Sequence, residues 1–325
     1  MPPQVSQNWR VTLSAIDPKP LPYQPYLWAA ADFQLGLRAI SPKQWVLMDA
    51  NFTATMREKR ALLAAHADKY YRTIPSSLPA QHELRERIAA HLVSDYPDFF
   101  SRQGSVITSR ADGHQCDLHD DVLEPLLQLS HLIEEDFMLV EQREGVPCIS
   151  AASNVYSSSG RIVSSVGANI ESAHQFVPTL NEKLAPRINR VLNSVHTEAP
   201  CERFNWQLTP MATLFFPPDN PHGANAAAMH AVAERLHRNP LETGRLLWIR
   251  VERQTLSRLP RSKAVAFSLH TYSHPLESIK SDLGSVRAML DLVRAYTLQR
   301  LKYSEMDVVL EPIIAWLESA ANTSA

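Results

Sequence analysis

The sequence predicts an α+β fold in which helices flank an antiparallel sheet. Helical patterns come first along the chain, β-branched and apolar runs follow in the middle, and helical patterns return at the end. Because the strands do not alternate regularly with helices, an antiparallel sheet is favoured over a doubly wound parallel one. The 325 residues suffice for one large domain or two ordinary ones with a well-buried core.

The N-terminal region is expected to be an arm followed by two helices. Prolines are dense in residues 1–26, and proline at this density blocks regular structure, so we expect an extended arm. The aromatic residues of the arm favour its docking on the body of the protein. Helical spacing over 51–73 and 79–95 predicts two helices, the second with Leu84 and Ile88 on one face.

The middle of the chain holds the predicted strands. Apolar runs predict strands over 105–109, 137–142, 205–216, 245–256 and 264–272, and strand or strand and loop over 146–165. The last two strands flank the residues RLPRSK, which suit a hairpin connection. Helices are predicted over 120–136 and 180–195, with a short alanine-rich helix within 217–244.

The C-terminal segment 276–319 is predicted to be helical, and Pro312 should break or kink it. These patterns divide the chain into four regions. They are a proline-rich arm over 1–26, an N-terminal helical region over 27–100, a sheet core over 101–275 and C-terminal helices over 276–325.

Composition excludes several classes of protein. The net charge of −2 is typical of neither a nucleic-acid-binding nor a membrane-surface protein. The sequence has only nine glycines and lacks both GxGxxG and GxxxxGK[ST], which argues against a chain that binds nucleotides through those motifs. Three scattered cysteines, no signal peptide and no long apolar stretch predict a soluble, cytoplasmic protein.

The stretch over 250–272 is the most informative for function. It places Arg250, Arg253 and Arg258 within a predicted hairpin. The planar fork of arginine suits carboxylates and phosphates, so the three are candidate anion-binding residues. Surface ion pairs, with Glu252 neutralising a neighbour, are the alternative interpretation.

Two further segments contain candidate residues. ERFNW places Arg203, Asn205 and Trp206 at a strand entry, and the residues alone favour a core tryptophan and a turn asparagine over a binding site. SAHQFVPTLNEKL contains His174, and histidine is a common metal and haem-iron ligand. The chain has 13 histidines, so its residue type alone does not single out His174.

Together these segments resemble one family, the haem-dependent oxidative N-demethylase alpha-subunit-like proteins. The matching segments are AHQFVPTLNEKL over 173–184, RFNW over 203–206 and RVERQTLSRLPRSKAVAFSLHTYSHPL over 250–276. The resemblance extends over about residues 20–280, and ERQTLxRLP is its most specific part.

The resemblance implies a PAS-like antiparallel sheet with helical additions, in which 101–275 forms the haem-binding core. It implies one b-type haem and activation of O₂ to remove a methyl group, as formaldehyde, from a small amine. Electrons would come from NADPH through separate flavin and iron–sulfur reductase subunits, which is consistent with the missing nucleotide-binding motifs.

The resemblance also implies roles for the candidate residues. His174 becomes the candidate haem-iron ligand. Arg250, Arg253 and Arg258 become candidates to hold the haem propionates, and Arg203, Asn205 and Trp206 become candidate pocket-wall residues.

The chain departs from the family pattern at several positions. The family's PSxW segment and following lysine give way to YSSSGRIVSSVG, with Arg161 in place of the tryptophan and Ser165 in place of the lysine. His270 replaces the family's arginine before Thr–Tyr, which makes it a second candidate haem ligand. We therefore expect a pocket of different shape and polarity. Three interpretations remain: a haem-dependent monooxygenase, a non-catalytic PAS-like sensor or scaffold, and a haem-free enzyme of the same fold.

Overall fold

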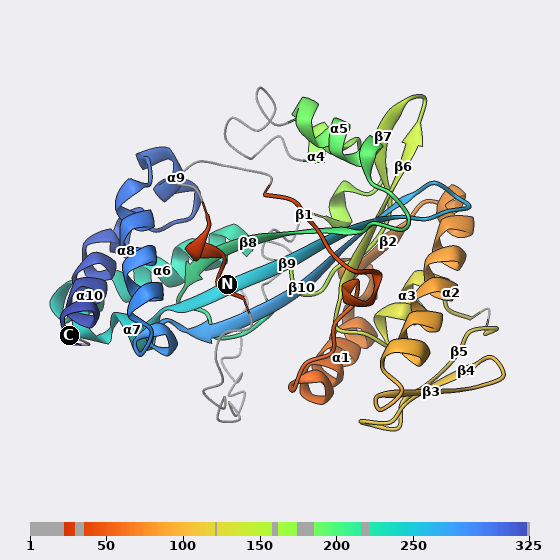
Figure 1. Cartoon of the computed structure of the whole chain (residues 1–325), viewed down its shortest axis with the longest axis horizontal. Helices are drawn as coiled ribbons and strands as arrows, with labels where there is room; N and C mark the ends of the chain where they lie inside the picture. Colours follow the sequence, from red (N-terminus) through yellow and green to blue (C-terminus); the bar gives the residue numbers. More distant parts are fainter. Residues whose placement is uncertain are drawn as a thin grey trace, which may run out of the picture.

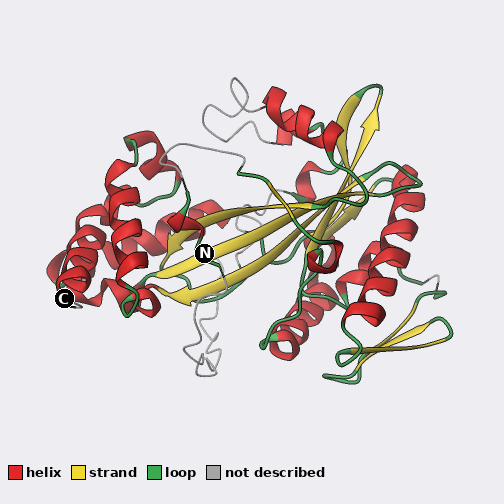
Figure 2. Cartoon of the chain, viewed as in Figure 1, coloured by secondary structure: helices red, strands yellow, loops and turns green. Residues whose placement is uncertain are grey.

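The computed structural model describes residues 23–29, 36–120, 122–157, 162–173, 185–215 and 221–323. Helices and antiparallel sheets make up the fold, which confirms the predicted α+β class (Figures 1 and 2). His174 and the proline-rich residues 1–22 lie outside the described residues. No helix in the described part of the chain is both long and apolar enough to cross a bilayer.

A seven-stranded sheet forms the centre of the molecule. Its strand order is β1-β8-β9-β10-β6-β7-β2, and every neighbouring pair is antiparallel. The strands are β1 (Arg38–Ala39), β2 (Tyr71–Thr73), β6 (Asp136–Arg143), β7 (Val146–Ser153), β8 (Cys201–Thr209), β9 (Trp248–Arg258) and β10 (Val265–Pro275).

Two hairpins set the register of the sheet. Glu144 and Gly145 join β6 to β7 with positive φ at both positions, as the favoured two-residue hairpin turn requires. The predicted hairpin between β9 and β10 is also present, with Arg258 opposite Val265. Its tip is held by Glu83, whose carboxylate accepts the backbone N–H groups of Arg261 and Ser262 at 2.7 Å each.

The N-terminal helices pack at one end of the sheet, beside a small three-stranded sheet (Figure 1). The helices and short 3-10 turns of this part are η2 (Pro42–Gln44), α1 (Phe52–Tyr70), η3 (Pro75–Ser77), α2 (Leu78–Asp95) and α3 (Pro125–Ser130). The short turn η1 (Pro25–Leu27) packs instead at the other end of the sheet, in the core that the C-terminal helices cover. The small sheet contains β3 (Phe100–Gln103), β4 (Val106–Ser109) and β5 (Gln115–Asp117).

The C-terminal helices pack at the other end of the sheet, and α4 and α5 lie over its side (Figure 1). These elements are η4 (Val163–Ser165), α4 (Ile170–Ala173), α5 (Ala185–Ser194), α6 (Pro221–Arg238), η6 (Pro240–Glu242), α7 (Thr243–Leu246), η7 (Leu276–Ile279), α8 (Leu283–Ala295), α9 (Leu298–Tyr303), η8 (Asp307–Val309) and α10 (Leu310–Thr323).

Two aromatic residues at the end of the predicted arm contact the sheet, as expected. Tyr26 is buried and packs edge-on against Trp206 with ring centroids 5.7 Å apart. Tyr23 packs against Tyr272 and Phe204. Trp206 therefore belongs to the apolar core between the sheet and the C-terminal helices.

The helix predicted over 120–136 is largely wrong, because only Pro125–Ser130 is helical. The reason is the buried amine of Lys59, to which the carbonyl groups of Ile133, Glu134 and Glu135 turn. Those carbonyls are consequently not used in helical hydrogen bonds.

Three smaller boundaries also differ from prediction. Residues 71–73 leave the helix and pair with β7 as β2. The strand predicted over 205–216 begins at Cys201 and ends at Thr209, just before a proline that cannot continue the ladder. Pro312 lies in the first turn of α10, where its missing N–H group costs no hydrogen bond, so this helix begins near the proline instead of breaking there.

Candidate functional site

The central sheet separates the predicted site residues onto two faces. Side chains alternate along a strand, and the register of β8, β9 and β10 fixes which of them share a face. One face, which we call the Arg250 face, carries Arg203, Asn205, Arg250, Glu252, Gln254 and Thr271. The opposite face, which we call the Arg253 face, carries Glu202, Trp206, Arg253, His270 and Tyr272.

Arg250 is fully buried and binds the loop that follows β7. Its guanidinium donates to the carbonyl oxygen of Tyr156 and, at 3.4 Å, to that of Thr213. Thr271 Oγ1 donates to the same Tyr156 carbonyl at 3.2 Å. Burial lowers the pKa of Arg250 to about 10, and the Glu252 carboxylate opposes this shift. The side chain therefore remains charged at neutral pH inside the protein.

Arg203 lies on the same face, beside Glu252. Its Nε atom is buried and has no hydrogen-bond partner among the residues that the structure describes. Burial lowers the pKa of Arg203, while the negative charge of Glu252 raises it. Glu252 in turn accepts a hydrogen bond from Gln254 Nε2 at 3.1 Å. The Arg250 face thus presents the buried guanidinium of Arg250 and the partly buried one of Arg203 beside the buried carboxylate of Glu252, and the buried Asp136 also acts on Arg250.

One end of the Arg250 face is covered by α4 and α5. Ile170 and Leu192 from these helices join Leu256 and Val265 from the sheet in one apolar cluster. Ala173 packs against this cluster, and it directly precedes His174 in the sequence. The chain therefore reaches the Arg250 face immediately before the candidate ligand.

Arg258 at the end of β9 is occupied by backbone groups. Its guanidinium donates to the carbonyls of Val195 at 2.9 Å, Lys263 at 2.7 Å and Leu192. Two of these carbonyls lie at the C-terminal end of α5, where a cation is favourable. Arg258 consequently binds α5 to the hairpin.

Arg253 is buried on the opposite face in an ion pair. Its Nε lies 2.6 Å from Glu202 Oε2, and its terminal nitrogens donate to the carbonyls of Gln44 and Trp45. The pair is internal. Arg253 is therefore neither part of a surface ion pair nor a cation left free to bind an anion. Arg38 makes a second contact with Glu202 at 2.6 Å.

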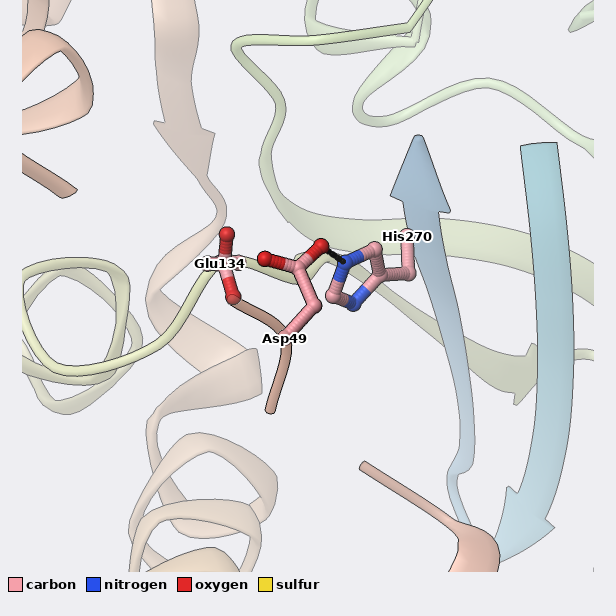
Figure 3. Close-up of side chains that lie close together, drawn as sticks. All are labelled: Asp49, Glu134 and His270. Carbon is pink, nitrogen blue, oxygen red and sulfur yellow. Dashed lines mark hydrogen bonds and ion pairs between the residues drawn. The ribbon is translucent and has the colours of Figure 1, made fainter. Parts of the chain in front are cut away.

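His270 lies in the middle of β10 among carboxylates (Figure 3). Its Nδ1 is 3.1 Å from Glu135 Oε1, and its Nε2 is 3.4 Å from Asp49 Oδ2. Burial by itself lowers the pKa of His270, but Glu135 and Asp49 outweigh it and raise this pKa to about 10. Both ring nitrogens are engaged, so axial ligation by His270 would require one of these contacts to break.

The carboxylates around His270 were not predicted from the sequence. Glu134, Glu135 and Asp136 are consecutive and all buried. Lys59, also buried, lies 2.9 Å from Asp136 Oδ1. Burial raises the pKa of Glu134 to about 8. The acidic triplet EED directly before an apolar strand could have indicated this site, because acidic residues next to a buried strand are buried with it.

Comparison with known families gives one match over most of the chain. The family described as haem-dependent oxidative N-demethylase, alpha subunit-like, matches residues 36–314. This range contains the sheet, both groups of candidate residues and nearly all of the flanking helices. The match confirms the resemblance carried by the three sequence segments. The chain therefore belongs to the haem-dependent oxidative N-demethylase alpha-subunit-like family.

Proposed function

We propose that this chain is the haem-binding subunit of a multi-subunit monooxygenase that demethylates a small amine or an amine-bearing metabolite. The observation that carries the proposal is the Arg250 face, where Arg203 and the fully buried Arg250 share one face of the sheet with the apolar cluster against which Ala173, the residue before His174, packs. Family membership supports the haem and the type of reaction.

The donor set of the Arg250 face fits a haem propionate. A propionate is a carboxylate, and guanidinium groups bind carboxylates through charge-assisted hydrogen bonds. Arg203 Nε is a buried donor without a partner in the described part of the chain, and such donors are costly unless a ligand accepts from them. We assign Arg203 and Arg250 to the propionates, Asn205 to the pocket wall and His174 to the iron.

The remaining candidates receive structural roles in this proposal. Trp206, Arg253 and His270 lie on the opposite face of the sheet, and Arg258 binds the backbone at the end of α5. We propose that they hold the sheet and its covering helices in place, so that the Arg250 face keeps its shape.

We also propose that the sheet is PAS-like. Its five long strands, numbered along the chain from β6 to β10, lie in the order second, first, fifth, fourth, third. The helical segments α4 and α5 fall between the second and third of these strands. This order and this placement of helices are those expected of a PAS-like sheet.

Bound haem would supply O₂ activation. The overall change is oxidation of an N-methyl group to formaldehyde: R–NH–CH₃, O₂, two electrons and two protons give R–NH₂, CH₂O and H₂O. We propose that the electrons come from NADPH through flavin and iron–sulfur partner subunits. The absence of nucleotide-binding motifs from this sequence supports a separate reductase.

The test is the absorption spectrum of the chain purified from haem-supplemented cells, first oxidised and then reduced with dithionite. We expect a Soret band that shifts on reduction and disappears in His174→Ala. His119→Ala is the matched control, because this histidine is exposed and lies outside the strands of the central sheet. A folded protein without a Soret band after haem titration would favour a haem-free enzyme. Haem without formaldehyde production from N-methyl amines would favour a sensor or scaffold.

A further inference from the structure

Three residues on the Arg253 side of the sheet form a compact set of metal-ligating groups. Asp49, Glu134 and His270 each place one ligand atom within 4.8 Å of the other two. They come from the segment before α1, the loop before β6 and the middle of β10. Figure 3 shows Asp49 between the Glu134 carboxylate and the His270 ring.

The distance between His270 Nε2 and Asp49 Oδ2 is that expected between two ligand atoms bound to one metal ion. At 3.4 Å it is long for a charged hydrogen bond. Zinc bonds to nitrogen and oxygen of about 2.0–2.2 Å place two tetrahedral ligands roughly 3.3–3.5 Å apart. A cation therefore fits between Nε2 and Oδ2 without separating the two side chains.

Glu135 orients the imidazole as a second-layer carboxylate does in metal sites. Its Oε1 accepts from His270 Nδ1 at 3.1 Å, which directs Nε2 toward Asp49. Histidine ligands usually donate their other ring N–H to a carboxylate or carbonyl in this way, which fixes the ring and increases its basicity.

The Glu134 carboxylate points to a bound ligand independently of the contact between His270 and Asp49. It is 4% exposed, and its Oε2 is buried without a hydrogen-bond partner in the described part of the chain. Lys59, a buried cation nearby, is engaged by Asp136 and by three backbone carbonyls. Asp49 and Glu135 share the positive charge of His270, and Glu134 Oε2 has no hydrogen-bond partner in the described part of the chain, so negative charge is in excess around the set.

Access to the set is through Asp49, whose side chain is 28% exposed, whereas those of Glu135 and His270 are buried. One imidazole and two carboxylates suit Zn²⁺ or Mn²⁺ better than Mg²⁺ or Ca²⁺, which prefer oxygen ligands alone. We propose that Asp49, Glu134 and His270 bind one divalent transition-metal ion, which joins the three segments. This site is independent of the haem proposal, since it lies on the other side of the sheet.

The test is Zn²⁺ binding by the full chain after removal of metals with EDTA and dialysis. Bound zinc is counted by equilibrium dialysis with elemental analysis, and affinity is measured by calorimetry. We expect one equivalent per chain, with affinity reduced more than about 100-fold in Glu134→Gln and His270→Arg, and about 10–100-fold in Glu135→Gln. His270→Arg keeps a positive charge opposite the carboxylates, so the fold has a substitute for the imidazolium.

His119→Ala serves as the control. The loop over 114–121 contains His114, Cys116 and His119, which are also metal-ligating residue types, so this variant tests whether zinc binds there instead. We expect it to bind zinc as the original chain does. Circular dichroism verifies that each variant is folded. Two results would overturn the proposal: a folded original chain that binds no zinc, or unchanged stoichiometry and affinity in both Glu134→Gln and His270→Arg. The first would leave an imidazolium–carboxylate cluster, and the second would place the ion elsewhere.

Discussion

Arg253 on β9 and Glu202 on β8 form an ion pair inside the protein, with 2.6 Å between Nε and Oε2 and side chains 1% and 5% exposed. The same guanidinium also holds the backbone of η2 and the residue after it, through the carbonyls of Gln44 and Trp45. One side chain therefore connects two strands to the segment that leads to Asp49.

Replacing Arg253 with alanine should destabilise the protein by about 3–5 kcal/mol, because it leaves Glu202 as an uncompensated buried charge. Arg38 contacts the same carboxylate, but its side chain is half exposed and provides less compensation. The free energy of unfolding in urea measures the loss. Arg253→Met combined with Glu202→Leu should recover most of it, whereas the exposed Arg245→Ala should change stability by less than about 0.5 kcal/mol. Equal stability of Arg253→Ala and Arg245→Ala would contradict the assignment.

Arg203→Met should weaken haem retention without destabilising the haem-free protein. The substitution removes a buried donor that lacks a partner in the described part of the chain, and Arg250 still compensates the charge of Glu252, so folding loses little. Haem loses a propionate contact, and its dissociation should accelerate about tenfold for a lost charged hydrogen bond of roughly 1.5 kcal/mol. Haem transfer to an acceptor protein measures the rate, and urea unfolding measures stability.

Arg258→Met is the matched comparison for Arg203→Met. Arg258 donates to three backbone carbonyls, so its loss should reduce the free energy of unfolding by about 2–4 kcal/mol. Once the variant is folded, haem dissociation should stay at the original rate. The opposite pattern, with Arg258 controlling haem and Arg203 controlling stability, would reverse the two roles.

Local sequence patterns predicted the elements of this fold better than its site. The hairpin of β9 and β10 follows from two apolar runs around RLPRSK, and the structure confirms it. The alternation of side chains along a strand is enough to place Arg250 and Arg253 on opposite faces, as the structure has them, but it could not show that both faces are covered and both arginines buried. That depends on helices from distant parts of the chain.

The cluster around His270 shows most clearly what local sequence patterns cannot predict. His270 and Asp49 are 221 positions apart in the sequence, and no periodicity joins them. Lys59 likewise ends the expected helix over 120–136 by binding carbonyls more than 70 positions away. Local propensity for a helix was present, and a tertiary contact overrode it.

Stability should fall in acid through His131. Burial lowers the pKa of His131 to about 4, and the positive charges of His114, Arg60 and Lys59 add to this. A lowered folded-state pKa means that the unfolded chain binds the proton more tightly, so stability is lost as pH falls from about 6.5 toward 4. Compared with pH 7.5, the loss from this group at pH 4.5 should be about 1–2 kcal/mol after allowance for screening.

The measurement for His131 is urea unfolding at several pH values. His131→Asn should lie closer to the original chain at pH 4.5 than at pH 7.5, because it cannot take up the proton on unfolding. The difference between the two proteins isolates His131 from the carboxylates that also titrate in this range. A constant difference across the pH range would exclude a neutral, buried His131.

Glu83 should anchor the β9–β10 hairpin to α2. Its carboxylate accepts two backbone N–H groups, from Arg261 and Ser262, at the tip of the hairpin. Lys263, the next residue, has a positive φ of 63°, so the tip has a strained backbone that these bonds help to hold. Glu83→Ala leaves both donors without the carboxylate and should cost about 2–4 kcal/mol. Glu86→Ala is the control, because Glu86 is exposed and forms an ion pair with the side chain of Arg261, which is worth less than about 1 kcal/mol. Urea unfolding compares the two variants, and hydrogen exchange at Arg261 and Ser262 should accelerate only in Glu83→Ala. Equal effects of the two substitutions would mean that packing of Leu259 and Ala264 against the N-terminal helices, not Glu83, fixes the hairpin.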